Sequence, residues 1–352
     1  MRILRPRPLS LRPSVSVVVP CYRYGAFLPR VVSSTLAQEG VDVEVLVVDD
    51  ASPDDSGRVA AGLAASDPRV RVIQHETNRG HIRTYNDGIA AATGDYLVLL
   101  SADDLLAPGA LARATALMEH DPTVGFVYGY SPDFADEPPA PRRTRASWSV
   151  WSSEEWISRL CARGSNVVSN PEVVMRRSIM TALGGEYDAR FPHTADLLLW
   201  LRAAARGNVG RVNGPDQGYY RVHGANMHLT EFSSVHTDLV ERARTFDAFL
   251  AEDLADHPRR PRWQDRARRA LALDGLRWAV WTLDSGDDEP GARVFAETAR
   301  SLWPPITSTR LWRGYERRTS ARGAASLDRL SFTVDWELRN KLRWRRWRQL
   351  GT

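Results

Sequence analysis

Short runs of β-branched residues alternate with stretches of helical spacing between residues 14 and 130, and this alternation restricts the possible folds more than any other feature of the chain. The apolar runs are too short for helices and are typical of buried strands; they lie at residues 14–19, 43–48, 70–74, 95–100 and 124–130. Strands joined by crossover helices predict the α/β class, with a mostly parallel, Rossmann-like sheet flanked by helices.

Polar residues follow three of these expected strands at the point where each one ends. They are Cys21, Tyr22 and Arg23 after the first strand, Asp49 and Asp50 after the second, and Asp103 and Asp104 after the fourth. Because ligands of parallel sheets bind beyond the carboxyl ends of the strands, we expect these side chains to line one crevice. Each acidic pair by itself could instead cap a helix. The convergence of all three strand ends favours a binding site.

The pattern changes from about residue 235 onward. Residues 238–254, 263–283 and 291–302 have helical spacing, with no strand expected between them. We therefore expect two parts, an α/β domain at residues 1–232 and a helical C-terminal region at residues 233–352. A segment rich in proline and charge, residues 133–147, is expected to be a surface loop.

Composition and charge indicate which cell compartment and which binding partners to expect. The 352 residues carry a net charge of +4, and charged residues are scattered through the first two thirds of the chain, so we expect no nucleic-acid partner. Cys21 and Cys161 do not make a disulfide framework, which indicates a reducing cytosol. No apolar run approaches the roughly 18 residues of a membrane span, and residues 1–13 lack the apolar core of a secretory signal. A cytoplasmic protein is expected.

Residues 336–350 combine three tryptophans, Trp336, Trp344 and Trp347, with several arginines. Such a segment could rest on an anionic membrane at its inner face, with tryptophan at the interface and arginine on the phosphates. The alternative is a packed helix whose tryptophans cover the α/β domain. The tryptophans do not share one face with the leucines, which favours the packed helix.

The motifs at the strand ends, taken in order, resemble family 2 glycosyltransferases of the GT-A fold. The resemblance covers about residues 14–226. It is carried by Val-Val-Val-Pro-Cys-Tyr at 17–22, Val-Val-Asp-Asp-Ala-Ser at 47–52, Asn-Arg-Gly at 78–80, Gly-Asp-Tyr at 94–96 and the Asp-Asp pair at 103–104. It implies a nucleotide-sugar-dependent catalytic domain at residues 1–232, with a nucleoside-diphosphate sugar as the donor.

The resemblance also implies where the donor binds. Pro20 and Tyr22 match residues that line the nucleoside pocket, Asp50 matches the carboxylate that contacts the base, and Arg79 matches an arginine on the donor side. Ala102 belongs to the same donor-binding set.

A divalent cation, Mn²⁺ or Mg²⁺, is implied at the end of the fourth strand. Asp103 matches the last aspartate of the family's Asp-x-Asp metal motif and also binds the donor, while Ser101 stands where the first aspartate would be. Carboxylate oxygens suit these cations, which bridge the oxygens of a diphosphate. A later segment resembles the family's Tyr-Arg-x-His motif and offers His223 as a second metal ligand, because imidazole tolerates Mn²⁺.

Asp196 takes the place of the family's catalytic aspartate, although Ala195 replaces its usual acidic neighbour. A carboxylate within hydrogen-bond reach of an acceptor hydroxyl can take the proton as the hydroxyl attacks, and attack opposite the leaving diphosphate inverts the anomeric carbon. An aspartate at a helix start can also be only a cap.

The expected reaction is transfer of the sugar to a hydroxyl of a carbohydrate, a lipid-linked or another acceptor, in the synthesis of a polysaccharide, glycolipid or other glycoconjugate. Two other functions remain open on the sequence. The residues at Ser101 and Ala195 would suit a catalytically degenerate protein that only binds a sugar or nucleotide. A nucleotidyltransferase, which shares a related sheet, would release pyrophosphate.

Overall fold

The computed structural model describes residues 1–142, 144, 146–224, 226, 234–286, 289–320 and 342. They form two compact units. Unit 1 holds residues 1–156 and the described residues between 167 and 226, and unit 2 holds residues 157–166 and the described residues from 234 onward. Residues 157–166 therefore group with unit 2 although they lie inside the expected α/β domain. The domain boundary at residue 232 stays a prediction.

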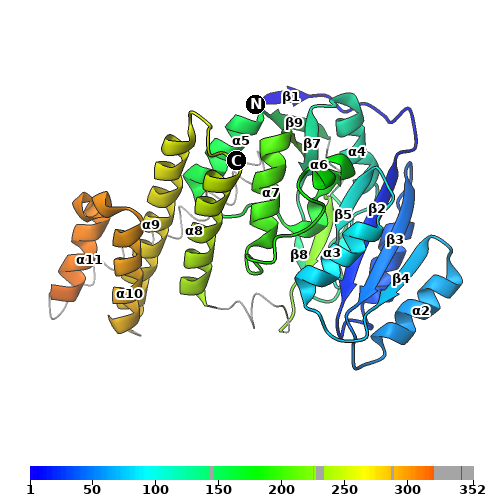
Figure 1. Ribbon diagram of the computed structural model, residues 1–352, viewed down its shortest axis with the longest axis horizontal. Helices are drawn as coiled ribbons and strands as arrows, with labels where there is room; N and C mark the ends of the chain where they lie inside the picture. The colour runs from blue at the N-terminus through cyan, green and yellow to red at the C-terminus, as the bar shows by residue number, and fades with distance from the viewer. Residues whose placement is uncertain are drawn as a thin grey trace. The chain divides into compact units, whose positions relative to one another are not determined.

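Unit 1 is built on a nine-stranded sheet with the order β1-β9-β11-β7-β10-β5-β2-β3-β4 (Figure 1). The strands are β1 (Arg2–Leu4), β2 (Ser14–Cys21), β3 (Asp42–Asp49), β4 (Val70–Gln74), β5 (Tyr96–Leu99), β7 (Val124–Tyr128), β9 (Ser147–Trp151), β10 (Val174–Arg176) and β11 (Asn208–Asn213). Seven of these strands run in one direction, while β9 and β10 run against them. The predicted mostly parallel sheet is confirmed.

Helices cover both faces of this sheet, and the side-chain alternation of the strands explains which helix covers which face. The helices of unit 1 are α1 (Leu28–Leu36), α2 (Ser56–Ser66), α3 (His81–Ala91), α4 (Ala110–His120), α6 (Arg177–Ala182) and α7 (Ala195–Arg206), while the residues of α5 (Ser153–Arg163) are divided between the two units. Val17 and Val47 point into the same core as α1, α2 and α4. Val18 and Val48 point to the other face, where α3 brings Gly88 against them.

A second sheet of three short strands, in the order β6-β12-β8, lies in the same unit. Its strands are β6 (Leu105–Leu106), β12 (Gly218–Arg221) and β8 (Asp133–Phe134). Strand β6 follows Asp103 and Asp104 directly, and β12 directly precedes the segment of His223. Because β6 and β12 pair through Leu105 and Tyr219, two segments far apart in the sequence are held side by side.

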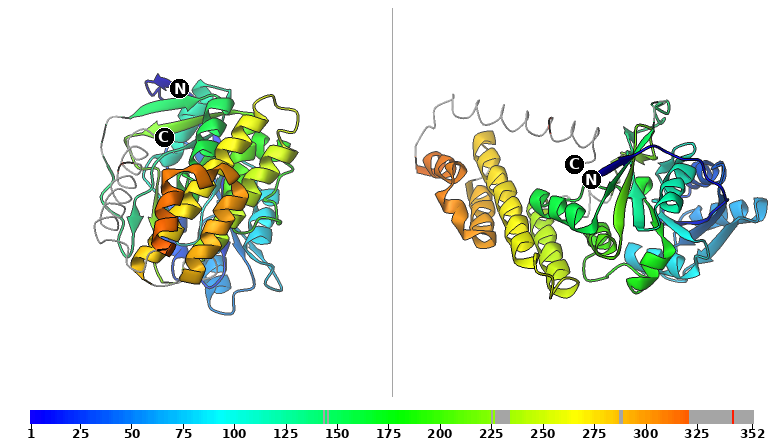
Figure 2. Two further views of the ribbon diagram at one scale, coloured as in Figure 1. Left: turned by 90° about the vertical axis from the view of Figure 1, so that its left-hand side faces the viewer. Right: turned by 90° about the horizontal axis from the view of Figure 1, so that it is seen from above.

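Unit 2 is helical, as expected, with α8 (Val235–Glu252), α9 (Arg260–Ser285), α10 (Glu289–Leu302), a 3₁₀ turn η3 (Pro304–Ser308) and α11 (Arg310–Ser320). Figure 2 draws these helices in yellow to orange. Small residues on α9 and α10, including Ala272, Ala279 and Ala296, let their backbones approach closely around a shared core. The predicted Trp/Arg segment at 336–350 lies outside the described residues, apart from Leu342.

The expected loop at residues 133–147 has neither helix nor strand among its described residues between 135 and 146, but strands mark both of its ends. Strand β8 lies at its start, and β9 begins at Ser147. Strand β9 pairs with both β1 and β11, a long-range contact that local pattern does not reveal. Helix α4 begins at Ala110, directly after Gly109, which adopts a left-handed conformation (φ 72°). Among the described residues, no helix combines the length and apolar character that crossing a membrane requires.

Candidate active site

The ends of the parallel strands place the predicted donor-binding residues along one edge of the sheet. Cys21 of β2 pairs with Asp49 of β3, which in turn pairs with Gln74 of β4. The residues that follow, Tyr22, Asp50 and His75, therefore leave the sheet at the same level. On the other side of β2, β5 ends at Leu99 and leads to Ser101 and Asp103.

Asp103 and His223 meet at this edge. His223 Nε2 lies 3.0 Å from Asp103 Oδ2, and the Nδ2 group of Asn226 is 3.4 Å from the same oxygen. Burial raises the pKa of Asp103, and the hydrogen bond with His223 partly offsets this effect. The pair is brought together by β6 and β12, so the structure unites the two predicted metal ligands.

Asp104 is a buried carboxylate next to this pair. Its Oδ1 accepts a hydrogen bond of 2.9 Å from the backbone amide of Arg221, and its Oδ2 has no hydrogen-bond partner among the described residues. Burial, and then the negative charge of Asp103, raise the pKa of Asp104 well above its usual range. Arg221 reaches back to donate from Nε to the backbone carbonyl of Asp103 at 3.0 Å, which fixes the turn between them.

Two aromatic rings pack around His223. The ring of Phe27 stacks on the imidazole with centroids 5.6 Å apart, and Tyr24 lies at the same distance in a tilted orientation. Burial and the charges of Asp103 and Asp104 raise the pKa of Tyr24 to about 12. These rings orient the imidazole toward Asp103; the sequence analysis did not single them out, although both follow directly on the strand-end motif of β2.

Asp196 lies in the first turn of α7. Its Oδ1 accepts a hydrogen bond of 2.7 Å from the amide of Leu197, and a negative charge is favoured at such a helix start. The pKa of Tyr220 is raised by burial and by the charges of Asp104, Asp103, Asp133 and Asp196, in that order. The charges of both the Asp103–Asp104 pair and Asp196 therefore act on the same phenol. The role of Asp196 as the base stays a prediction.

Asp50 is 3% exposed, and the protein supplies partners to both of its oxygens. Oδ1 accepts from the amide of Arg79 at 2.8 Å and lies 2.7 Å from His75 Nδ1, while Oδ2 accepts from the amide of Gly80 at 2.9 Å. Burial acts to raise the pKa of Asp50, but these hydrogen bonds outweigh it and hold the pKa below its usual range. Asp50 therefore shapes the turn at 78–80; its contact with a base stays a prediction.

The other predicted donor-binding residues, Pro20, Tyr22 and Ala102, belong to the segments at the ends of β2 and β5. Pro20 pairs with Val48 within the sheet, Ala102 is buried, and Tyr22 is 39% exposed with the Arg23 guanidinium 5.4 Å from its ring centre. Arg23 itself has a φ of 62°, so the turn after β2 carries a left-handed residue beside the exposed ring.

Helix α3 connects the donor side to the segment before Asp196. Asn86 exchanges two hydrogen bonds with the backbone of Tyr187, and His81 Nε2 lies 3.2 Å from the carbonyl of Pro192. Tyr85 packs edge-on against Tyr187 with ring centres 5.4 Å apart. These contacts explain how α3, which begins at the turn held by Asp50, also positions the approach to α7.

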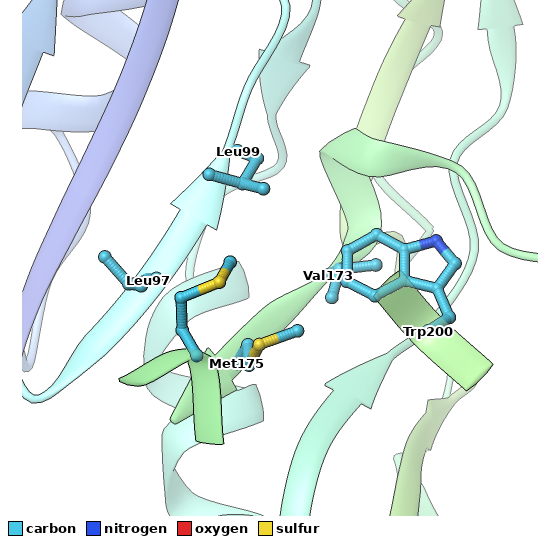
Figure 3. A pocket seen from close by; sticks show the side chains of 6 residues that line it. Leu97, Leu99, Val173, Met175 and Trp200 are labelled. Carbon is cyan, nitrogen blue, oxygen red and sulfur yellow. The ribbon is translucent and has the colours of Figure 1, made fainter. Parts of the chain in front are cut away.

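An apolar cavity of about 10 Å³ lies elsewhere in unit 1, lined by residues of β5, β10, α6 and α7 (Figure 3). Leu99, Met175 and Trp200 are among its lining side chains. It has room for one water at most and offers few polar partners, so it is a packing gap rather than a ligand site.

The side chains at the strand ends can be compared with the ligands that the predicted cation requires. Among the described residues, no group of three or more His, Cys, Asp or Glu side chains surrounds a common point. The two predicted ligands, Asp103 and His223, are nevertheless in contact. Mg²⁺ or Mn²⁺ often takes few protein ligands, because substrate phosphates and water complete its shell. The chemistry of the pair therefore fits a cation that is bound together with a diphosphate.

Residues 16–183 match the model of glycosyl transferase family 2. The matched region belongs to that family. The resemblance found in the sequence is thereby confirmed. The succinoglycan biosynthesis protein ExoO of Rhizobium meliloti is 42% identical over 110 residues, which are 31% of this chain and 31% of that protein.

Two solved structures are similar in fold to this chain. Residues 1–349 of TarS from S. aureus, in complex with UDP-GlcNAc, match with a TM-score of 0.59 and 15% identity over 87% of each chain. The mannosyltransferase PcManGT from Pyrobaculum calidifontis, in complex with GDP-Man and Mn²⁺, matches with a TM-score of 0.54 and 19% identity over 94% of this chain and 88% of that one. The GT-A fold is confirmed.

Proposed function

We propose that this family 2 chain is a metal-dependent, inverting glycosyltransferase that moves a sugar from a nucleoside-diphosphate sugar to an acceptor hydroxyl. The contact between Asp103 and His223 carries the proposal. These residues lie 120 positions apart in the sequence, yet their side chains are 3.0 Å apart at the carboxyl edge of a mostly parallel sheet. This is where such sheets bind their ligands.

Asp103 and His223 would hold Mn²⁺ or Mg²⁺ together with the donor diphosphate. A cation bound there would neutralise the charge that develops on the leaving nucleoside diphosphate. Tyr24 and Phe27 hold the imidazole in place, and Arg221 fixes the turn of Asp103 through its backbone carbonyl. The mannosyltransferase of similar fold that was solved with GDP-Man and Mn²⁺ supports this assignment.

Asp196 is assigned as the base. As the acceptor oxygen forms its bond to the anomeric carbon, its proton passes to the Asp196 carboxylate, and the electron pair of the breaking bond leaves on the diphosphate oxygen. Attack from the side opposite the diphosphate inverts the anomeric configuration. The position of Asp196 in the first turn of α7 favours its charged form before the proton arrives.

The nucleoside side of the donor is assigned to Pro20, Tyr22, Ala102 and the turn that Asp50 holds around Arg79. The exposed ring of Tyr22 offers a surface for stacking, and the Arg79 guanidinium can meet a phosphate. The nucleotide sugar in the TarS complex and the polysaccharide named for ExoO support a nucleotide-sugar donor and a glycoconjugate product. The acceptor would be a hydroxyl of a carbohydrate, a lipid-linked sugar or another molecule.

Asp196→Asn tests the assignment. A panel of nucleotide sugars is first screened by thermal shift with Mn²⁺, because a ligand that binds the folded state raises the apparent stability. With the donor so found, Asp196→Asn should reduce transfer by about 10²–10⁴-fold while donor affinity stays close to that of the parent protein.

Asp55→Asn is the matched control, because Asp55 also stands at a helix start but pairs with the exposed Arg58 on α2. It should leave transfer unchanged. Nuclear magnetic resonance of the product would report the anomeric configuration. Retention of configuration, or full turnover by Asp196→Asn, would remove Asp196 from the role of base.

A further inference from the structure

His75 is a buried side chain that the sequence motifs do not include. Its imidazole is 4% exposed. Nδ1 lies 2.7 Å from Asp50 Oδ1, and Nε2 lies 3.0 Å from Asp87 Oδ2 on α3 without the geometry of a hydrogen bond. The imidazole therefore lies between two carboxylates: Asp50 follows the end of β3, and Asp87 lies on α3, the helix that follows the turn at 78–80.

Arg79 contacts the same two oxygens. Its backbone amide donates to Asp50 Oδ1 at 2.8 Å, and its guanidinium Nη1 donates to Asp87 Oδ2 at 3.0 Å. His75 and Arg79 thus close a loop of four residues with Asp50 and Asp87, which we call the four-residue ring. Arg83 adds a second guanidinium to Asp87 at 3.0 Å.

The four-residue ring fixes both the backbone and the guanidinium of Arg79. The Asp50 side holds the backbone of Arg79 and Gly80, whose φ of 82° suits glycine, and the Asp87 side holds the guanidinium. A buried carboxylate that loses one donor must pay a desolvation penalty or move. Loss of His75 would therefore release Asp50 from its present orientation, and the turn at 78–80 would follow.

We propose that His75 is a positioning residue for donor binding, acting through Asp50 on the Asn78–Arg79–Gly80 turn; this inference rests on the proposed function. The Nδ1 contact carries the effect, because it is the contact with hydrogen-bond geometry. His75 itself touches neither the donor nor the reacting atoms. Its loss weakens donor binding and leaves the chemical step in place.

Three substitutions separate the two sides of the imidazole. His75→Asn keeps an N–H near the place of Nδ1, His75→Gln keeps one near the place of Nε2, and His75→Leu removes both. We expect the donor KM to stay within about threefold for His75→Asn and to rise about tenfold for the other two, the size of a lost hydrogen bond to a charged group. The kcat should change less than about threefold in all three.

Hydrogen exchange of a peptide covering residues 76–83 gives a readout that does not depend on activity. It should accelerate in His75→Gln and His75→Leu but not in His75→Asn. Should His75→Leu fail to fold, the comparison of the Asn and Gln variants still decides. Equal KM and equal exchange for the Asn and Gln variants would overturn the role of His75 in an enzyme that still transfers sugar. Failure of the parent protein to bind any nucleotide sugar would overturn the proposed function as well.

Discussion

Replacement of Glu172 by glutamine should stabilise the protein, and the structure gives the size of the effect. Glu172 ends the 3₁₀ turn η1 (Asn170–Glu172), which directly precedes β10, and it is 1% exposed. Its Oε1 accepts from the amide of Ser169 at 3.2 Å, whereas Oε2 has no hydrogen-bond partner among the described residues. Burial raises the pKa of this carboxyl from 4.5 to about 8, against smaller lowering effects from its hydrogen bonds and from Arg211.

The sign of the pH dependence follows from the proton count. Between pH 4.5 and about 8 the folded protein keeps the Glu172 proton while the unfolded chain loses it, so the folded state binds more protons and its stability falls as the pH rises. At about 1.36 kcal/mol per pH unit, Glu172 costs about 1 kcal/mol at pH 5 and about 4 kcal/mol at pH 8. Glutamine remains neutral and escapes this cost.

Urea unfolding of both proteins at several pH values, followed by tryptophan fluorescence, measures the difference. The free energies of unfolding of Glu172→Gln and the parent protein should converge toward pH 4.5 and separate by about 3 kcal/mol more at pH 8 than at pH 5. A constant difference across this range would refute the reasoning, because a carboxyl that titrates alike in the folded and unfolded states contributes no pH dependence.

Two other predictions concern the metal pair and the packing of α3. Removal of divalent cations with a chelator should abolish transfer, and addition of Mn²⁺ should restore it. His223→Ala should raise the Mn²⁺ concentration needed for half-maximal activity by at least about tenfold. The control His236→Ala, in unit 2, should leave this concentration unchanged, and equal Mn²⁺ dependence of both variants would exclude His223 as a ligand. Gly88→Ala should lower Tm, because a Cβ would lie 2.3 Å from Val18 Cγ1 and 3.1 Å from Val48 Cγ2, an overpacking that costs about 1–3 kcal/mol. Gly62→Ala on α2, where nothing lies within 4 Å of the added Cβ, should instead gain up to about 1 kcal/mol, and equal shifts for both glycines would contradict the packing argument.

Local pattern was sufficient for the parallel core. The strand expected at residues 70–74 has those bounds in the structure, and β2 and β3 extend the expected strands by one or two residues at their ends. A strand buried on both faces needs apolar, β-branched residues throughout, so its sequence has few other interpretations. The acidic strand ends followed from the same logic, since parallel strands deliver their carboxyl ends to one edge.

The antiparallel strand β9 (Ser147–Trp151) escaped local analysis, because its identity depends on pairing with β11, about 60 residues later in the sequence. Strand β10 is only three residues long and pairs with β5 and β7 on its two sides. Short strands of this kind are stabilised by their partners rather than by propensity.

The same distinction applies to the candidate site: local sequence predicts some of its features, and others depend on tertiary contacts. The residue types at the strand ends, and with them the expectation of a carboxylate-rich crevice, can be read from the sequence because each motif is contiguous. The encounter of Asp103 with His223 depends on the pairing of β6 with β12, and the ring of Asp50, His75, Asp87 and Arg79 depends on α3 crossing back over β3. Contacts between segments this distant arise only when the sheet sets their register, which is why tertiary structure decided them.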